Sequence, residues 1–98
     1  MTPGGLSETK PATPEVQQLV NQVKQEFERR SGMNCRVFTA IEYRTQVVAG
    51  IMYFIKVQVS ASEYVHLKVL QSLPHENLGP SLVSFETGKT RDDPLNPF

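Results

Sequence analysis

The fold of this chain is decided by residues 13–32, which read TPEVQQLVNQVKQEFERRSG. Thr13 is a residue type that caps helices, Pro14 suits the first helical position, and Gly32 favours a helix end. Between them, apolar residues recur with the period of a helix that buries one face. These are Val16, Leu19, Val20, Val23 and Phe27. The stretch therefore predicts one amphipathic helix of about five turns.

After this helix the apolar period changes to two, which is typical of strands with one buried face. The alternation predicts strands over 36–44, 51–60, 64–70 and 82–86, and the short gap at 60–63 indicates antiparallel neighbours. In the first strand, Val37, Ile41 and Tyr43 lie on one side. A helix with one apolar stripe and a sheet with one apolar face can bury each other. We therefore predict a two-layer α+β fold in a single domain, residues 1–98.

The chain before the helix is expected to be an extended arm. It contains Pro3, Gly4, Gly5 and Pro11 and few apolar groups. Such a composition does not favour a packed core. We expect the arm to be flexible over about residues 1–6, with Leu6 as its anchor.

Composition excludes several classes of function. The 98 residues carry 10 basic and 10 acidic side chains, so no nucleic-acid partner is expected. The one cysteine, Cys35, cannot form an internal disulfide, which favours a reducing compartment and a cytoplasmic protein. The first residues have neither the basic residue nor the apolar stretch of a signal peptide. No run approaches the ~20 apolar residues of a membrane span, so no membrane partner is expected.

Few side chains are suited to catalysis. Cys35 could pair with His66 or His75, but a small buried thiol is the simpler interpretation. His66 lies in an alternating strand and is expected on its polar face, while Asp92 and Asp93 are expected in solvent. The sequence has no metal-ligand pattern and no glycine-rich phosphate loop. We therefore expect neither a cofactor nor an enzyme.

Residues 46–50, QVVAG, separate two alternating strands. One interpretation is a single long strand with Gly50 at a bulge. The other is a hairpin turn that exposes Val47 and Val48. Spacing alone does not choose between them, but an unbroken strand from 36 to 59 would far exceed the usual ~3–10 residues. If the chain turns here, two exposed valines indicate a contact surface.

Residues 73–80, LPHENLGP, form the next break, and by themselves they predict only an ordinary loop. In a meander, however, alternate turns lie at the same end of the sheet. The 46–50 turn and the 73–80 loop would then be neighbours, and the N-terminal arm could reach that end too. Three such projections form an edge and not a pocket.

These residues, taken in order, resemble the stefins, the type 1 branch of the cystatin family of cysteine-protease inhibitors. Gln46-Val47-Val48-Ala49-Gly50 matches the family's first-hairpin signature, and Pro3-Gly4-Gly5 matches its N-terminal element. Further matches lie at 10–13, 53–57, 66–69 and 73–77, so the resemblance covers nearly the whole chain.

The resemblance implies a cystatin-like fold, in which an antiparallel sheet wraps around one long helix and residues near Leu6–Pro11 add a strand. It also implies reversible, tight-binding, competitive inhibition of papain-like cysteine proteases such as cathepsins, whose active-site cleft the family blocks with an N-terminal arm and two hairpin loops. The protease-binding residues that it implies here are Pro3, Gly4, Gln46, Val47, Val48, Ala49, Gly50, Leu73, Pro74 and His75.

Two stretches depart from the stefin pattern. Ile51 and Met52 stand where many stefins have polar residues, and this apolar surface is expected to tune target choice or promote self-association. Pro94 and Pro97 argue against a regular last strand, because proline cannot donate to a ladder.

Two further alternatives concern partners and assembly. A rival interpretation of the function is a non-inhibitory α+β scaffold that binds another protein through the same edge. We expect a mostly monomeric protein, with a domain-swapped dimer, opened at the Gln46–Gly50 turn, as a second form.

Overall fold

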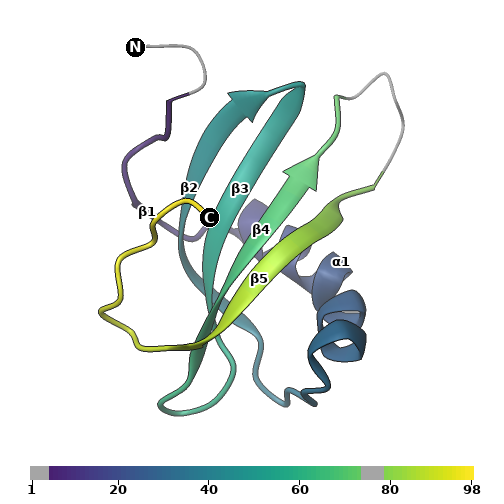
Figure 1. Cartoon of the computed structure of the whole chain (residues 1–98), viewed down its shortest axis with the longest axis vertical. Coiled ribbons are helices and arrows are strands. Elements are labelled where there is room, and N and C mark those ends of the chain that lie inside the picture. Colours follow the sequence, from purple (N-terminus) through teal and green to yellow (C-terminus); the bar gives the residue numbers. More distant parts are fainter. Residues whose placement is uncertain (1–4, 74–78) are drawn as a thin grey trace.

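One helix packs against a five-stranded antiparallel sheet in the part of the chain that the computed structural model describes, residues 5–73 and 79–98 (Figure 1). The elements are β1 (Lys10–Pro11), α1 (Pro14–Ser31), β2 (Thr39–Val48), β3 (Gly50–Gln58), β4 (Tyr64–Gln71) and β5 (Ser81–Lys89). The strands pair in the order β1-β2-β3-β4-β5, so each lies beside its neighbour in sequence. The predicted α+β, cystatin-like architecture is confirmed.

The helix has the ends and the buried face that its sequence predicts. The hydroxyl of Thr13 accepts a hydrogen bond from the Val16 N–H at 3.2 Å, and Gly32 ends the helix with a φ of 77°. All five residues of the apolar stripe are buried. Among the described residues, no helix has both the length and the apolar character needed to cross a membrane.

The amino-terminal segment runs along β2, as the resemblance implied. β1 pairs with β2 at Tyr43 and Glu42, and Leu6 forms a separate bridge with Gln46. Going backwards from β1 to Leu6, the segment therefore approaches the turn between β2 and β3. At the opposite end of the sheet, the expected β3–β4 turn is closed by the Val59 N–H, which donates to the Glu63 carbonyl at 2.9 Å.

The prediction for the first long strand was wrong in its start and in the inward face of its first residues. It was right for Tyr43, which packs against the core. The alternation grouped Val37 with later apolar residues, but β2 begins after it and Val37 is exposed. Phe38 and Ala40 are buried instead. The ladder with β3 shifts its register between Ala40 and Glu42, a bulge that moves the following side chains to the other face.

Two polar side chains of α1 tie it to the sheet. Gln17 bridges the backbone at the start of β2: its Nε2 donates to the Phe38 carbonyl at 3.0 Å, and its Oε1 accepts from the Ala40 N–H at 2.8 Å. Near the helix end, Arg30 donates to the carbonyls of Leu82 and Val83 in β5, at 2.7 and 3.3 Å. The helix is therefore fixed at both ends of its buried face.

The core lies between α1 and the face of the sheet that the helix covers. Phe27 is its centre: its ring centroid lies 5.4 Å from that of Phe38 and 5.0 Å from that of Phe85. Ile55, Val57, Val65, Leu67 and Val69 complete the buried surface of β3 and β4. These residues alternate as predicted, so the sequence locates this face correctly.

The other face, which we call the outer face, is covered in its lower half by the C-terminal segment, residues 90–98 (Figure 1). The Lys56 Nζ donates to the carbonyls of Arg91 and Asp93, the latter at 2.6 Å. Leu95 is buried, and the ring of Phe98 lies 5.8 Å from that of Phe54. The sheet thus has cover on both faces.

The structure of this segment corrects one expectation and agrees with two others. His66 does lie on the face away from the helix, but that face is covered there, and His66 is only 1% exposed. Asp92 is exposed as expected, and the carboxylate of Asp93, which is not buried, accepts from the Thr90 N–H at 2.7 Å and closes a turn. Residues 90–98 contain no strand, as Pro94 and Pro97 predicted.

Candidate functional site

The β2–β3 turn is built with a single residue between its paired ends. Val48 pairs with Gly50, so that Ala49 alone makes the turn. Gly50 has a φ of 126°, and a Cβ at this position would lie 2.5 Å from the Gln71 carbonyl oxygen. Only glycine fits such a backbone and such a close approach. The hairpin interpretation of residues 46–50 is therefore correct, and the single long strand is wrong.

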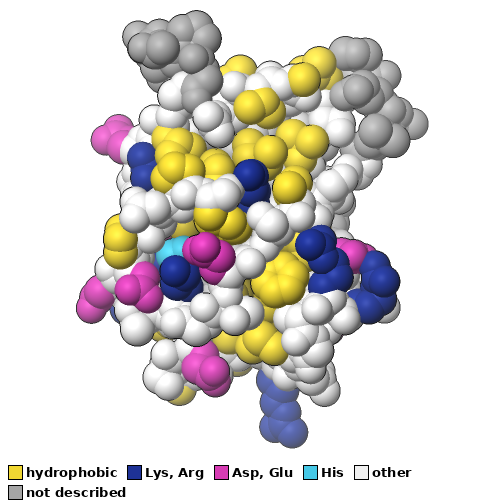
Figure 2. Space-filling model, viewed as in Figure 1, with side chains coloured by type: hydrophobic (Ala, Val, Ile, Leu, Met, Phe, Trp, Pro, Cys, Tyr) yellow, Lys and Arg dark blue, Asp and Glu magenta, His cyan; other side chains and the backbone are white. Residues whose placement is uncertain are grey.

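This turn carries apolar side chains on both of its faces. Val47 and Val48 are 54% and 44% exposed. Val47 pairs with Ile51 on the face that α1 covers, whereas Met52 pairs with Gln46 on the outer face. Figure 2 shows hydrophobic side chains gathered on the outer face towards the end of the sheet where this turn lies. The turn is thus an apolar projection on a rigid support.

The amino-terminal segment reaches the same end. Leu6 bridges to Gln46, and Ser7 is held against Thr45 by two hydrogen bonds. The Ser7 N–H donates to the Thr45 carbonyl at 2.8 Å, and the Thr45 N–H donates to the Ser7 hydroxyl at 2.9 Å. Arg44 donates from Nε to the Ser7 carbonyl at 2.9 Å. Residues 6 and 7 are therefore fixed beside the turn.

The end of β4 forms the third part of this region. Gln71 pairs with Ile51, and the Gln71–Ser72 backbone lies against Gly50. Leu73, which follows, is 40% exposed. The chain returns to β5 at the same end of the sheet (Figure 1). We call the assembly of Leu6, residues 46–50 and Leu73 the loop end.

The loop end brings together six of the ten predicted site residues: Gln46, Val47, Val48, Ala49, Gly50 and Leu73. The other four, Pro3, Gly4, Pro74 and His75, lie outside the described residues. The expectation that alternate turns of the meander lie side by side holds for the described parts. That these residues bind a protease remains a prediction.

The described residues offer no catalytic group at the loop end. Cys35 is buried in the core on the helix side of the sheet, and burial, with the nearby Glu28 carboxylate, raises the pKa of its thiol. His66 is buried on the outer face, so the two are separated by the sheet. No group of three potential metal ligands occurs in the described parts of the chain.

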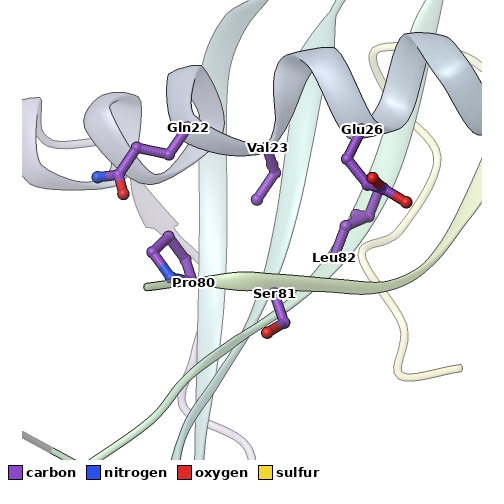
Figure 3. A pocket seen from close by; sticks show the side chains of 6 residues that line it. All are labelled: Gln22, Val23, Glu26, Pro80, Ser81 and Leu82. Atoms are coloured by element: carbon purple, nitrogen blue, oxygen red, sulfur yellow. The ribbon is translucent and has the colours of Figure 1, made fainter. Parts of the chain in front are cut away.

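A shallow pocket lies elsewhere, between α1 and the start of β5 (Figure 3). It has a volume of about 320 Å³ and is lined by Gln22, Val23, Glu26, Pro80, Ser81 and Leu82. Val23 and Leu82 belong to the core, and the only ionisable group, Glu26, is paired with Arg29. The pocket therefore offers no chemistry of its own.

Sequence reasoning missed Arg44, which contacts both ends of the chain. Besides Ser7, its guanidinium donates from Nη1 to the carbonyl of Leu95 at 3.0 Å. No sequence signal marks it, because it appears only as a polar residue of an alternating strand.

Comparison of the sequence with known proteins gives a matching family model and several relatives. Residues 4–92 match the Cystatin domain family. The chain is 51% identical over 98 residues to Cystatin-A of Felis catus, with both chains fully covered. It is 47% identical to Leukocyte cysteine proteinase inhibitor 1 of Sus scrofa, covering all of this chain and 95% of the relative. It is 46% identical over 95 residues to Cystatin-B of Bos taurus, covering 97% of each.

Proposed function

The chain belongs to the cystatin family, and on that premise we propose that it is a reversible, tight-binding, competitive inhibitor of papain-like cysteine proteases of the cathepsin type. The observation that carries the proposal is the loop end. There, Val47 and Val48 are exposed on a turn fixed by Gly50, with Leu6 and Leu73 on either side.

Burial of the exposed valines supplies affinity. Val47 and Val48 can each contribute ~1.5–3 kcal/mol when they leave water in a protease cleft. The turn that carries them is held in one shape in the free protein, because Gly50 lies against the Gln71 carbonyl. Little conformational entropy is then lost on binding.

The N-terminal arm supplies the second contact. Gly4 has no side chain, so the backbone there can pass close to the nucleophile of the protease. Nucleophilic attack requires a carbonyl held in near-attack geometry, and we propose that the arm presents none. The protease is therefore blocked without being acylated, and the inhibitor leaves intact.

The third contact is the loop between β4 and β5. Leu73 is exposed where β4 ends, and Pro74 and His75 follow it in sequence. We propose that these three residues, with Gln46–Gly50, fill one side of the cleft, while Pro3 and Gly4 fill the other.

Titration of active papain tests the proposal. Activity should fall to zero at one inhibitor per active enzyme and return on dilution into substrate. The apparent inhibition constant should rise linearly with substrate concentration, and the mass of the chain should be unchanged. Trypsin, which has a different active site, serves as the control. Full papain activity in the presence of excess chain would instead support the rival scaffold, which binds another protein through the loop end.

We further propose that the inhibitor acts as a monomer in a reducing compartment such as the cytoplasm. Cys35 is a free, buried thiol and suits that compartment. A dimer that exchanges strands at the Gln46–Gly50 turn would lose the shape of the turn. Dimer fractions from size-exclusion chromatography should therefore not inhibit papain.

A further inference from the structure

Arg44 links the amino-terminal segment, at Ser7, to the C-terminal segment, at Leu95. From the outer face of β2, its Nε donates to the Ser7 carbonyl at 2.9 Å and its Nη1 donates to the Leu95 carbonyl at 3.0 Å. One planar guanidinium therefore holds the amino-terminal segment on one side and the C-terminal segment on the other.

The Leu95 side of this link is firmly fixed. Leu95 is only 2% exposed, and the burial of its side chain keeps the whole residue, including its carbonyl oxygen, in place. The segment before it is anchored independently by Lys56, whose Nζ donates to the Asp93 carbonyl at 2.6 Å. The acceptor thus orients the guanidinium of Arg44 in one position.

The Ser7 side leads directly to the proposed protease contact. Ser7 is paired with Thr45, and the preceding residue, Leu6, bridges to Gln46 at the base of the β2–β3 turn. Residues 1–4 precede Leu6 in the sequence, separated from it only by Gly5. The base of the arm, at Leu6 and Ser7, is therefore fixed where Arg44 binds.

We infer that Arg44 is a positioning residue for the N-terminal arm, coupling the arm to the C-terminal segment so that it enters a protease cleft with less loss of entropy. This inference rests on the proposed inhibitory function. An arm whose base at Leu6 and Ser7 is already fixed loses less freedom on binding, and charge-assisted hydrogen bonds are the stronger kind.

A double-mutant cycle tests the coupling. Arg44→Gln should raise the inhibition constant for papain about 5–10-fold in the full chain. In a chain that lacks residues 1–4, the same substitution should change the constant less than about twofold, because the arm it aligns is gone. Arg44→Lys should fall between, since an ammonium can hold one of the two carbonyls but not both in the same geometry.

Lys68→Gln is the matched control. It also removes a bond from a β-strand cation to the C-terminal segment, but it leaves both Arg44 bonds in place. It should change the inhibition constant less than about twofold in either background. Equal losses for Arg44→Gln with and without residues 1–4 would overturn the inference, because the effect would then not pass through the arm.

Amide hydrogen exchange gives a second readout that needs no protease. In Arg44→Gln the Ser7 N–H, bonded to Thr45, should exchange several-fold faster, while the Leu67 N–H in the core keeps its protection. Unchanged Ser7 protection would contradict the inference even if papain is inhibited. If the unmodified chain fails to inhibit papain, the proposed function fails, and exchange at Ser7 still decides whether Arg44 orders the arm.

Discussion

At the scale of single residues, Val48 tests the loop end as a binding surface. Val48→Asp places a charge where an apolar side chain should leave water, so inhibition of papain should weaken at least ~10-fold, or about 1.4 kcal/mol. Val37→Asp is the control, because Val37 is 41% exposed against 44% for Val48 but precedes β2 at the other end of that strand. The measurement is the inhibition constant for papain, which should rise for Val48→Asp and stay nearly unchanged for Val37→Asp. Equal effects would remove the β2–β3 turn from the mechanism.

Gly50 tests what holds that turn in shape. Gly50→Ala adds a Cβ 2.5 Å from a backbone oxygen at a φ of 126°, so the free energy of unfolding should fall by about 2–4 kcal/mol. Gly32→Ala is the matched control, because its φ of 77° is also positive but its Cβ meets nothing within 4 Å. It should cost about 1 kcal/mol. Urea unfolding measures both, and equal losses would contradict the close contact.

At the scale of elements, Gln17 joins helix to strand. Gln17→Ala leaves the Phe38 carbonyl and the Ala40 N–H without these partners, so stability should fall by about 1–3 kcal/mol. Gln18→Ala, one position along and exposed, should cost less than about 0.5 kcal/mol. Chemical unfolding of the two variants compares them directly. A loss no larger for Gln17 than for Gln18 would show that the bridge adds no stability.

At the scale of the whole molecule, the C-terminal segment covers part of the outer face of the sheet. Polar groups on that face, such as His66, are therefore buried. Burial, together with the positive charges of Lys56 and Lys89, lowers the pKa of His66 to about 4. The carboxylates of Glu86 and Asp93 act in the opposite direction but do not offset the burial. The folded chain therefore favours a neutral imidazole at this position.

This preference predicts a pH dependence of stability. In the unfolded chain His66 binds a proton near pH 6.5, whereas in the folded chain it does so only near pH 4. The free energy of unfolding should thus be level above pH 6.5 and fall by about 3 kcal/mol as the pH drops to 4. His66→Leu should flatten the profile over this range. Urea unfolding at several pH values measures it, and parallel profiles for the two proteins would refute the assignment.

The helix could be predicted from sequence because its signals are local, whereas the β2–β3 turn was favoured over one long strand only by the usual length of strands. Thr13 and Gly32 lie at the two ends of α1, and the 46–50 stretch interrupts a period of two. The position of the loop end could also be predicted, because alternate turns of a meander lie at the same end of the sheet.

The cover of the outer face could not be predicted in this way. Lys56 contacts Arg91 and Asp93, which lie 35 and 37 positions later in the chain. Leu95 and Phe98 anchor the same segment without any periodic pattern. The bulge after Ala40 was missed for a related reason, since it becomes visible only when the β2–β3 register is known. Arg44 belongs to the same class, because both of its partners lie more than 35 positions away.

The contact of Arg30 with β5 has a consequence for the behaviour of the protein at high concentration. β5 is the last strand of the sheet, and its free side presents backbone groups on which a strand from another molecule could assemble. Arg30 already occupies the carbonyls of Leu82 and Val83 and lies over the ring of Phe85. An incoming strand would have to displace this side chain first. Arg30 of the helix therefore hinders edge-to-edge assembly of sheets from different molecules.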